Sequence, residues 1–374
     1  MKCNYQICTN CVMDTTDPDI FFDENGVCNH CINFQEVTKQ NWFPDEKGTE
    51  IWQDWVTKIK ADGKGKDYDC IIGISGGIDS AYLAYKLQEY NLRILAVHID
   101  AGWNSDISVR NIELLIKNLN LDLFTHVVNW EEMKDLQRSY LKASVINQDI
   151  PQDHAFFARL CQEAKIHKIK YFLSGGNIST ECVLPSSWGF DNLDLKNLKA
   201  IHKYYGQNKL KDYPTIGFWD VYVINPFLRN QKILRPLNFM KYKKEEAKKE
   251  LTEKIGWNDY GDKHHESRFT RFYQGYYLYE KFGIDKRKAH LSSLILTNQL
   301  SRDKALDELE KKPYDIALIE EDISYIAKKL ELSVDEFMVI LESPANKHED
   351  FSTNVRLRNL VKFGKKLLPG ISIK

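Results

Sequence analysis

The chain has 374 residues, which is too long for one small hydrophobic core and suits about two or three packed units. Hydrophobic residues make up 43% of it and charged residues 28%, and the formal net charge of −1 provides no overall attraction to nucleic acid. No stretch approaches the ~20 apolar residues of a membrane-spanning helix, and the N-terminal sequence MKCNYQICTNC has no apolar signal core. We therefore expect a cytoplasmic globular protein without a membrane partner, whose eight cysteines are thiols or metal ligands rather than disulfides.

Residues 1–45 are rich in Cys, Asp and Asn and poor in periodic apolar segments, so they cannot form much of a core. They contain two C-x-x-C pairs: Cys8 with Cys11, and Cys28 with Cys31. Four thiolates at this spacing can surround one tetrahedral Zn²⁺, which would supply the folding free energy that the segment lacks. We predict a zinc-ribbon-like module with a structural site. An iron–sulfur cluster with Cys3 as a spare ligand, or cysteines without metal, are the alternatives.

Residues 46–235 are predicted to form one domain, in which strand-like and helix-like segments alternate from about residue 67, after a linker-like DGKGK stretch at 62–66. The strand-like segments are uninterrupted apolar runs at 68–75, 93–100, 123–129 and 171–176. Between them, apolar residues recur at three- and four-residue spacing in 80–91, 108–120 and 155–170. This pattern predicts an α/β domain whose parallel sheet is covered by helices on both faces.

The sequence SGGIDS joins the first predicted strand to the first predicted helix. Gly76 and Gly77 let backbone N–H groups approach ligand oxygens, and the helix start adds free N–H groups and a positive dipole end. Ser75 and Ser80 add hydroxyl donors, and Asp79 could hold Mg²⁺. The lysine of a Walker A sequence is missing. A glycine-rich turn without a ligand is the alternative.

SGGIDS resembles the pyrophosphate loop (PP-loop) of ATP pyrophosphatases, which cleave ATP between its α- and β-phosphates and transfer AMP to a substrate oxygen. VHIDAGW at 97–103 resembles the position where this superfamily binds adenine, which makes Asp100 a candidate ATP ligand. SGGNISTE at 174–181 resembles its second phosphate and metal element. The candidates there are Gly175 and Gly176 for ATP, Asn177 and Thr180 for the substrate, and Glu181 for Mg²⁺, where many relatives carry Asp. Asp79, Ser80 and Glu181 are the candidate catalytic residues.

Residues 236–374 are predicted to be helical and to contact substrate or partners. Segments 239–256 and 301–312 are amphipathic, and Pro313 ends the second. A capping box for a further helix is indicated by two residues in the sequence SVDE, Ser333 and Glu336.

Residues 261–295 interleave basic and aromatic side chains, which suits a nucleotide sugar or RNA and equally a solvated helix face over an aromatic core. His264 and His265 are adjacent and would not share one metal on a helix, so we predict substrate or phosphate contact for at least one. Arg268 and Arg271 are three residues apart and could bind a diphosphate together, although ion pairs explain such charges equally well.

From Cys8 to about Leu300 the chain resembles the N-acetyl sugar amidotransferase family. The resemblance lies in CTNCVMDTTDP, VHIDAGWNSDISVRNIE, SGGNISTE and the basic–aromatic segment. It implies a role in surface-polysaccharide biosynthesis, such as that of the lipopolysaccharide O-antigen, or of nonulosonic acids. The implied reaction uses ATP and Mg²⁺ to convert an acetamido group of a nucleotide-linked sugar to an acetamidino group through an O-adenylyl imidate, which ammonia then attacks.

The chain shows no glutaminase nucleophile, because Lys2 follows Met1 and the remaining cysteines lack a glycine-flanked turn. The resemblance therefore implies a partner glutaminase and an ammonia-channel subunit like those of the imidazole-glycerol-phosphate synthase pair. Cys70 and Cys161 are expected in the core.

A tRNA thiolase of the same superfamily is the alternative function. It requires a reactive cysteine near the loop, for which Cys182 is the candidate, and a basic RNA-binding surface. The near-neutral charge weakens this alternative, so we expect no nucleic-acid partner. A non-enzymatic adaptor that senses ATP is a third possibility and would not need the basic–aromatic segment.

Overall fold

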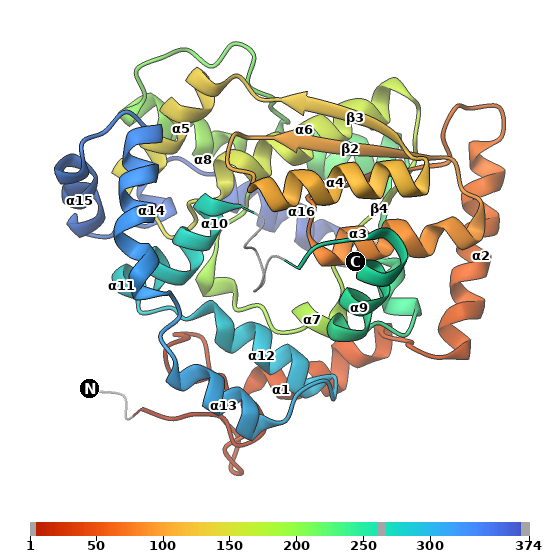
Figure 1. Ribbon diagram of the computed structural model, residues 1–374, viewed down its shortest axis with the longest axis horizontal. Helices are drawn as coiled ribbons and strands as arrows, with labels where there is room; N and C mark the ends of the chain where they lie inside the picture. Colours follow the sequence, from red (N-terminus) through yellow and green to blue (C-terminus); the bar gives the residue numbers. More distant parts are fainter. Residues whose placement is uncertain (1–4, 260–266, 368–374) are drawn as a thin grey trace.

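The computed structural model describes residues 5–259 and 267–367, and in these ranges the chain folds around a five-stranded parallel sheet (Figure 1). The strands are β1 (Cys70–Gly73), β2 (Ile94–Asp100), β3 (Asp122–Val127), β4 (Tyr171–Leu173) and β5 (Lys232–Leu234). Their order is β3-β2-β1-β4-β5, and every pairing is parallel. The predicted α/β fold class is confirmed.

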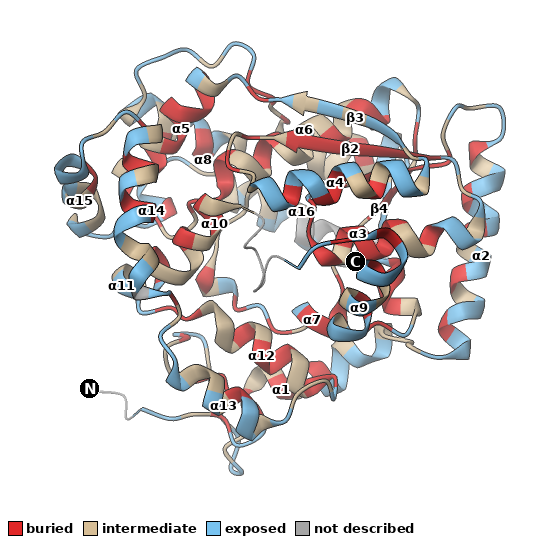
Figure 2. Cartoon of the chain, viewed as in Figure 1, coloured by how far each residue is buried: buried red, intermediate tan, exposed pale blue. Residues whose placement is uncertain are grey.

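The first four strands are those predicted from apolar runs, but the two edge strands depart from the expectation of full burial. Figure 2 shows β2 buried along its length, whereas β3 carries mostly exposed and half-buried residues. β5 was not predicted, because its three residues contain a lysine and form no apolar run. Central parallel strands therefore match the two-sided apolar pattern, and edge strands do not.

Alternate residues of the strands face two different hydrophobic clusters, as the two-residue period of a strand requires. Ile72 packs with one cluster and its neighbour Ile71 with the other. The first cluster includes residues of α2 (Glu46–Gly63), α3 (Ile78–Leu87), α4 (Asp106–Leu119) and α9 (Lys244–Ile255). The second includes residues of α5 (Trp130–Ala143), α6 (Ile150–Ile166), α7 (Ile178–Glu181) and α8 (Leu195–Tyr205). Helices thus cover both faces of the central strands.

Helix α2 was not predicted, and it includes the first two residues of the expected linker at 62–66. The side chain of Asp45 caps its start by accepting a hydrogen bond from Gly48 N at 3.1 Å. The segment also contacts the sheet domain, since Arg93 NH2 donates to Gly63 O at 2.8 Å. The stretch is therefore part of the packed domain.

The predicted helical C-terminal region is confirmed within the described residues. Its helices are α10 (Arg268–Phe272), α11 (Leu278–Phe282), α12 (Lys286–Leu296), α13 (Arg302–Glu310), α14 (Ile316–Lys329), α15 (Val334–Glu342) and α16 (Val355–Leu367), and the N-terminal region adds α1 (Asn29–Asn33). The capping box at the start of α15 is formed as predicted: Glu336 N donates to Ser333 Oγ at 3.2 Å, and Ser333 N to Glu336 Oε2 at 2.8 Å. No helix in the described ranges combines the length and apolar character needed to cross a membrane.

Candidate functional site

The turn between β1 and α3 lies at the carboxyl edge of the sheet, beside its central strand. Gly76 adopts a positive φ of 81°, and a Cβ there would lie 2.6 Å from Ser108 O in α4, so the position requires glycine. The hydroxyl oxygens of Ser75 and Ser80 are 3.3 Å apart, and Gly77 N donates to Ser75 Oγ at 3.3 Å. The turn therefore places two hydroxyl groups at the start of α3, an arrangement that suits phosphate oxygens.

The second glycine-rich segment, between β4 and α7, packs directly against this turn because β4 is the neighbour of β1. A Cβ on Gly175 would lie 2.8 Å from Ser80 N. The side chain of Asn177 connects the two segments: its Nδ2 donates to Asp79 Oδ1 at 3.0 Å. Its Oδ1 caps α7 by accepting from Thr180 N at 3.0 Å.

These contacts give the buried Asn177 and Thr180 a structural role in the two loops, and substrate contact by either residue stays a prediction. Asp79 lies in the first turn of α3, where the helix dipole favours a carboxylate. In addition to Asn177, Tyr242 OH donates to the same oxygen, Asp79 Oδ1, at 2.5 Å. Two donors on one oxygen fix the orientation of this carboxylate.

Asp100 ends β2, and its carboxylate shapes the loop that follows. Its Oδ1 accepts hydrogen bonds from Gly102 N at 2.8 Å and from Asn104 Nδ2 at 3.3 Å. Gly102 has a φ of 83°, and a Cβ there would lie 2.7 Å from the Trp130 ring. The loop is therefore closely packed, and the role of Asp100 in ATP binding stays a prediction.

A carboxylate and a guanidinium group flank the second glycine-rich segment. Glu181 Oε2 lies 3.4 Å, and Arg235 Nε 3.9 Å, from the position that a Cβ on Gly176 would take. The sequence around Arg235 gives no sign of its position, because it follows β5, whose three residues show no strand pattern. A carboxylate can bind Mg²⁺ and a guanidinium group can bind phosphate, so both side chains suit an ATP site.

A cavity of about 770 Å³ opens beside Thr180 and Glu181. Most of its remaining lining comes from the C-terminal helices and from the start of α9. It is bordered by the following basic side chains: Lys243, Lys244, Arg271, Lys286, Arg287, His290 and Lys304. The cavity therefore adjoins the second glycine-rich segment on one side and the C-terminal region on the other.

The two arginines predicted to bind a diphosphate are paired with carboxylates. Arg268 forms ion pairs with Glu321 at 2.6 Å and with Asp322, and Arg271 pairs with Asp322 at 2.5 Å. The ion-pair interpretation that the sequence left open therefore describes both residues. Of the two, only Arg271 also lines the cavity. His264 and His265 lie outside the described residues.

Residues 266–367 match the family model described as "LPS biosynthesis protein WbpG-like, C-terminal domain". These residues, called the WbpG-like domain below, are similar to that family over about a quarter of the chain. The description of this family names lipopolysaccharide biosynthesis, and most of the cavity lining belongs to the matched residues. A comparison with curated proteins gives no match.

Two solved structures are similar to the chain at a low level. One is an NH3-dependent NAD synthetase from Campylobacter jejuni subsp. jejuni NCTC 11168 in complex with the nitrate ion, with a TM-score of 0.29 and 18% identity over 56% of this chain and 82% of that chain. The other is an NMN synthetase from Francisella tularensis, with a TM-score of 0.25 and 15% identity over 56% of this chain and 97% of that chain. The fold assignment rests on the sheet and loops themselves.

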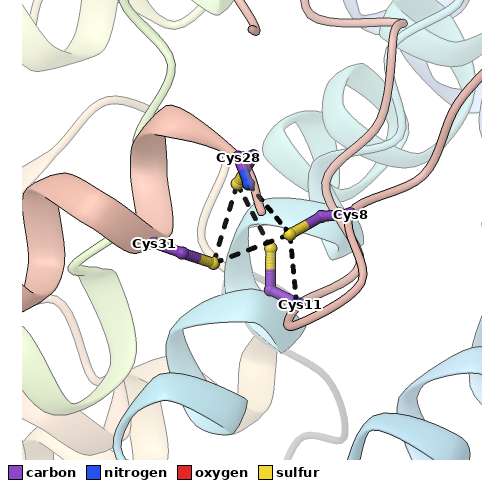
Figure 3. A group of neighbouring side chains, drawn as sticks. All are labelled: Cys8, Cys11, Cys28 and Cys31. Atoms are coloured by element: carbon purple, nitrogen blue, oxygen red, sulfur yellow. Dashed lines mark hydrogen bonds between the residues drawn. The ribbon is translucent and has the colours of Figure 1, made fainter. Parts of the chain in front are cut away.

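The four cysteines of the N-terminal region form one buried cluster (Figure 3). Their Sγ atoms all lie within 4.8 Å of one another, and three pairs are 3.6–3.8 Å apart. Sulfur atoms around a tetrahedral ion at the Zn–S distance of about 2.3 Å would be separated by about 3.8 Å, so the cluster fits zinc. Backbone N–H groups point at the sulfurs, as in the 3.2 Å contact from Cys28 N to Cys8 Sγ.

The cysteine module packs against α12 and α13 of the WbpG-like domain. Arg302 donates to the carbonyl oxygens of Cys8 at 2.8 Å and Cys11 at 3.0 Å. Lys288 pairs with the buried Asp14 at 2.5 Å. Since α12 also lines the cavity, the module supports one side of it.

Asp149 lies next to the cavity-lining part of the WbpG-like domain and is almost fully buried. Its Oδ1 accepts from Gln152 Nε2 at 2.7 Å and from Thr270 Oγ1 at 3.2 Å. Burial, together with the nearby Asp153, raises the pKa of Asp149 to about 8. The carboxyl group is therefore mainly neutral in the folded protein near pH 7.

This shift predicts a pH-dependent effect of Asp149→Asn. Because the folded-state pKa lies above the unfolded value of about 4, the contribution of Asp149 to stability falls as pH rises from about 4 to about 8. The variant lacks this loss, so its stability relative to the wild type is expected to increase between pH 5 and pH 7, by up to about 3 kcal/mol. Urea unfolding at both pH values measures the difference. A difference that stays constant with pH would contradict the assignment.

Proposed function

We propose that the chain is an ATP-dependent amidotransferase that converts the acetamido group of a nucleotide-linked N-acetyl sugar to an acetamidino group. The observation that supports this most is the meeting of two glycine-rich loops at Asp79, next to a cavity lined by a WbpG-like domain. The loops suit ATP, and the cavity has a size typical of small-molecule sites. ATP and its acceptor would thus be adjacent.

The reaction requires activation, because an amide carbon is a poor electrophile. The amide oxygen attacks the α-phosphorus of ATP, and pyrophosphate leaves with the electron pair of the broken P–O bond. Ammonia then attacks the carbon of the O-adenylyl imidate and loses a proton, and AMP leaves with the former amide oxygen. The protein contributes chiefly by holding the amide oxygen and the α-phosphorus in line.

The side chains at the loops have distinct parts in this scheme. Ser75, Ser80 and the N–H groups at the start of α3 bind the departing pyrophosphate and stabilise its charge. Asp79 and Glu181 hold Mg²⁺, which when bound neutralises phosphate charge. The only cluster of three or more metal-ligating side chains in the described ranges is the cysteine module. An ATP-bound Mg²⁺ is compatible with this, because it takes few protein ligands.

The cavity is the proposed acceptor site, and Lys304 is the proposed contact for the acceptor diphosphate. Its ammonium group forms no ion pair or hydrogen bond with the described part of the chain, whereas Lys243 pairs with Glu246 and Arg287 with Asp285. Ammonia would come from a partner glutaminase through a channel subunit, since the sequence shows no glutaminase nucleophile.

The tRNA thiolase alternative is disfavoured by the state of Cys182. Burial raises the pKa of this thiol to about 11, and its Sγ contacts Ser293 O at 3.9 Å. A thiol held neutral is a poor nucleophile for sulfur transfer. The match of residues 266–367 to a polysaccharide-biosynthesis domain also favours a sugar substrate.

A direct assay tests the proposal. Purified protein receives ATP, Mg²⁺, ammonia and a panel of UDP- and CMP-linked N-acetyl sugars, and the products are analysed by mass spectrometry. Formation of AMP and pyrophosphate, with one sugar oxygen replaced by NH, is the expected result. AMP formation only with tRNA and a sulfur donor would instead support the thiolase.

The close contact of the two loops predicts that Gly175→Ala impairs turnover. The added Cβ would lie 2.8 Å from Ser80 N, so one loop must shift. We expect AMP formation to fall about 10- to 100-fold. Gly189→Ala is the matched control, because a Cβ there meets no atom within 4 Å. Equal activity of both variants would contradict the proposed loop geometry.

A further inference from the structure

The loop of residues 101–105, between β2 and α4, is held by the WbpG-like domain, whose helix α10 lies near it (Figure 1). Three consecutive loop residues contact this domain: Gly102 O accepts from Lys329 Nζ, Trp103 O accepts from Arg268 N at 3.0 Å, and Asn104 pairs with Ser267 in an antiparallel bridge. The Trp103 ring also packs on Phe269, with centroids 5.0 Å apart. The shape of the loop therefore depends on how α10 and α14 are placed.

Asp322 of α14 connects α14 to α10. It is fully buried, and its carboxylate accepts from Arg268 Nε, from Arg271 NH2 at 2.5 Å and from Tyr314 OH. A buried carboxylate between two guanidinium groups is strongly constrained, because its loss would leave both guanidinium groups without their shared partner. Asp322 thus fixes the position of α10 relative to α14.

The two arginines bound to Asp322 face different parts of the site. Arg271 lines the cavity, whereas the backbone N–H of Arg268 holds the loop after β2. They lie about one turn apart on α10, so one carboxylate fixes both.

We propose that Asp322 is a positioning residue that maintains the shape of loop 101–105 and joins the acceptor cavity to the nucleotide site. The loop begins directly after Asp100, whose carboxylate accepts a hydrogen bond from Gly102 N. A shift of the loop therefore changes the orientation of the Asp100 carboxylate at the nucleotide site. The expected effect on ATP binding rests on the proposed function. The effect of Asp322 on the position of the loop is independent of that function and can be measured without any ligand.

Hydrogen exchange followed by mass spectrometry tests the positioning. In Asp322→Asn, the amides of 101–105 are expected to exchange about tenfold faster than in the wild type, while those of 70–80 are unchanged. Glu321→Gln is the control, because this exposed partner of Arg268 forms a surface ion pair of little energetic value. Unchanged exchange of 101–105 in Asp322→Asn would overturn the proposal.

Arg268→Met provides a second test if Asp322→Asn fails to fold by circular dichroism. It removes the Arg268–Asp322 link and leaves the Arg271–Asp322 pair in place. The same local increase in exchange at 101–105 is expected, and its absence would again overturn the inference.

Nucleotide binding separates this role from a purely structural one. In Asp322→Asn, the Kd for Mg²⁺-bound α,β-methylene-ATP and the KM for ATP are expected to rise about tenfold, with kcat at saturating ATP within about twofold. Unaltered nucleotide affinity despite a loosened loop would refute the link to the nucleotide site. If the wild type itself does not bind the analogue, the proposed function fails, and the exchange result still decides the role of Asp322.

Discussion

Replacing Asp79 by alanine is expected to lower AMP formation about 10²- to 10³-fold without unfolding the protein. The carboxylate lies in the first turn of α3, and Asn177 Nδ2 and Tyr242 OH hold one of its oxygens at 3.0 and 2.5 Å. Under the proposed function, the carboxylate fixed in this way would hold Mg²⁺ against the phosphates of ATP. The measurement is the steady-state rate of AMP release with saturating ATP, Mg²⁺ and acceptor.

Tyr242→Phe is the matched control for Asp79→Ala. It removes one donor to the carboxylate and keeps the charge, so a smaller loss, about tenfold, is expected. Circular dichroism and metal content are expected to match the wild type in both variants. If Asp79→Ala retains full turnover, the assignment of the loop to ATP phosphates is wrong.

The cysteine module is predicted to bind Zn²⁺, and removal of this metal is expected to unfold residues 5–33 and to loosen the cavity lining. Structural Zn²⁺ contributes on the order of 10 kcal/mol of apparent binding free energy in small zinc modules, more than this core-poor segment can supply otherwise. Cys28→Ser is expected to lose the bound zinc, measured by elemental analysis. Faster hydrogen exchange in α12 is expected to follow, because Arg302 and Lys288 lose their partners in the module.

Cys161→Ser is the control for this variant, since Cys161 lies in α6, apart from the cluster. It is expected to keep the metal and the wild-type exchange of α12. Nucleotide binding is expected to survive in Cys28→Ser, because the two glycine-rich loops hold each other in place, as in the hydrogen bond from Asn177 Nδ2 to Asp79 Oδ1. Normal metal content or unchanged α12 exchange in Cys28→Ser would refute the supporting role of the module. Iron instead of zinc in the wild type would favour the iron–sulfur alternative.

The central strands and the two glycine-rich turns could be predicted because they carry strong local signals. Buried parallel strands such as β1 are continuous apolar runs, and a turn such as that at Gly76 admits only glycine. The cysteine cluster was predictable for the same reason, since its ligands occur at fixed spacing. β5 was missed because its three residues form no apolar run. α2 was missed although Trp52, Val56 and Ile59 recur at three- and four-residue spacing and are buried on one face.

The parts of the site that depend on tertiary packing could not be predicted. Arg268 and Arg271 appeared available for a ligand, but their partner Asp322 is some fifty residues further along the chain. Substrate contact by Asn177 stays a prediction, and the sequence gives no sign that its amide donates to Asp79 across the β1–β4 pairing. Arg235 was not considered, because only the sheet order brings it to the second loop. Periodicity reports local structure and does not report which charges meet.

The fate of the amide oxygen tests the account most directly. An acceptor sugar labelled with ¹⁸O in its acetamido carbonyl is incubated with the protein, ATP, Mg²⁺ and ammonia, and the released AMP and pyrophosphate are analysed by mass spectrometry. The account predicts one ¹⁸O atom in each AMP formed and none in pyrophosphate, because the amide oxygen bonds to the α-phosphorus and leaves with AMP. Unlabelled AMP, or label retained in the sugar product, would contradict adenylation of the amide.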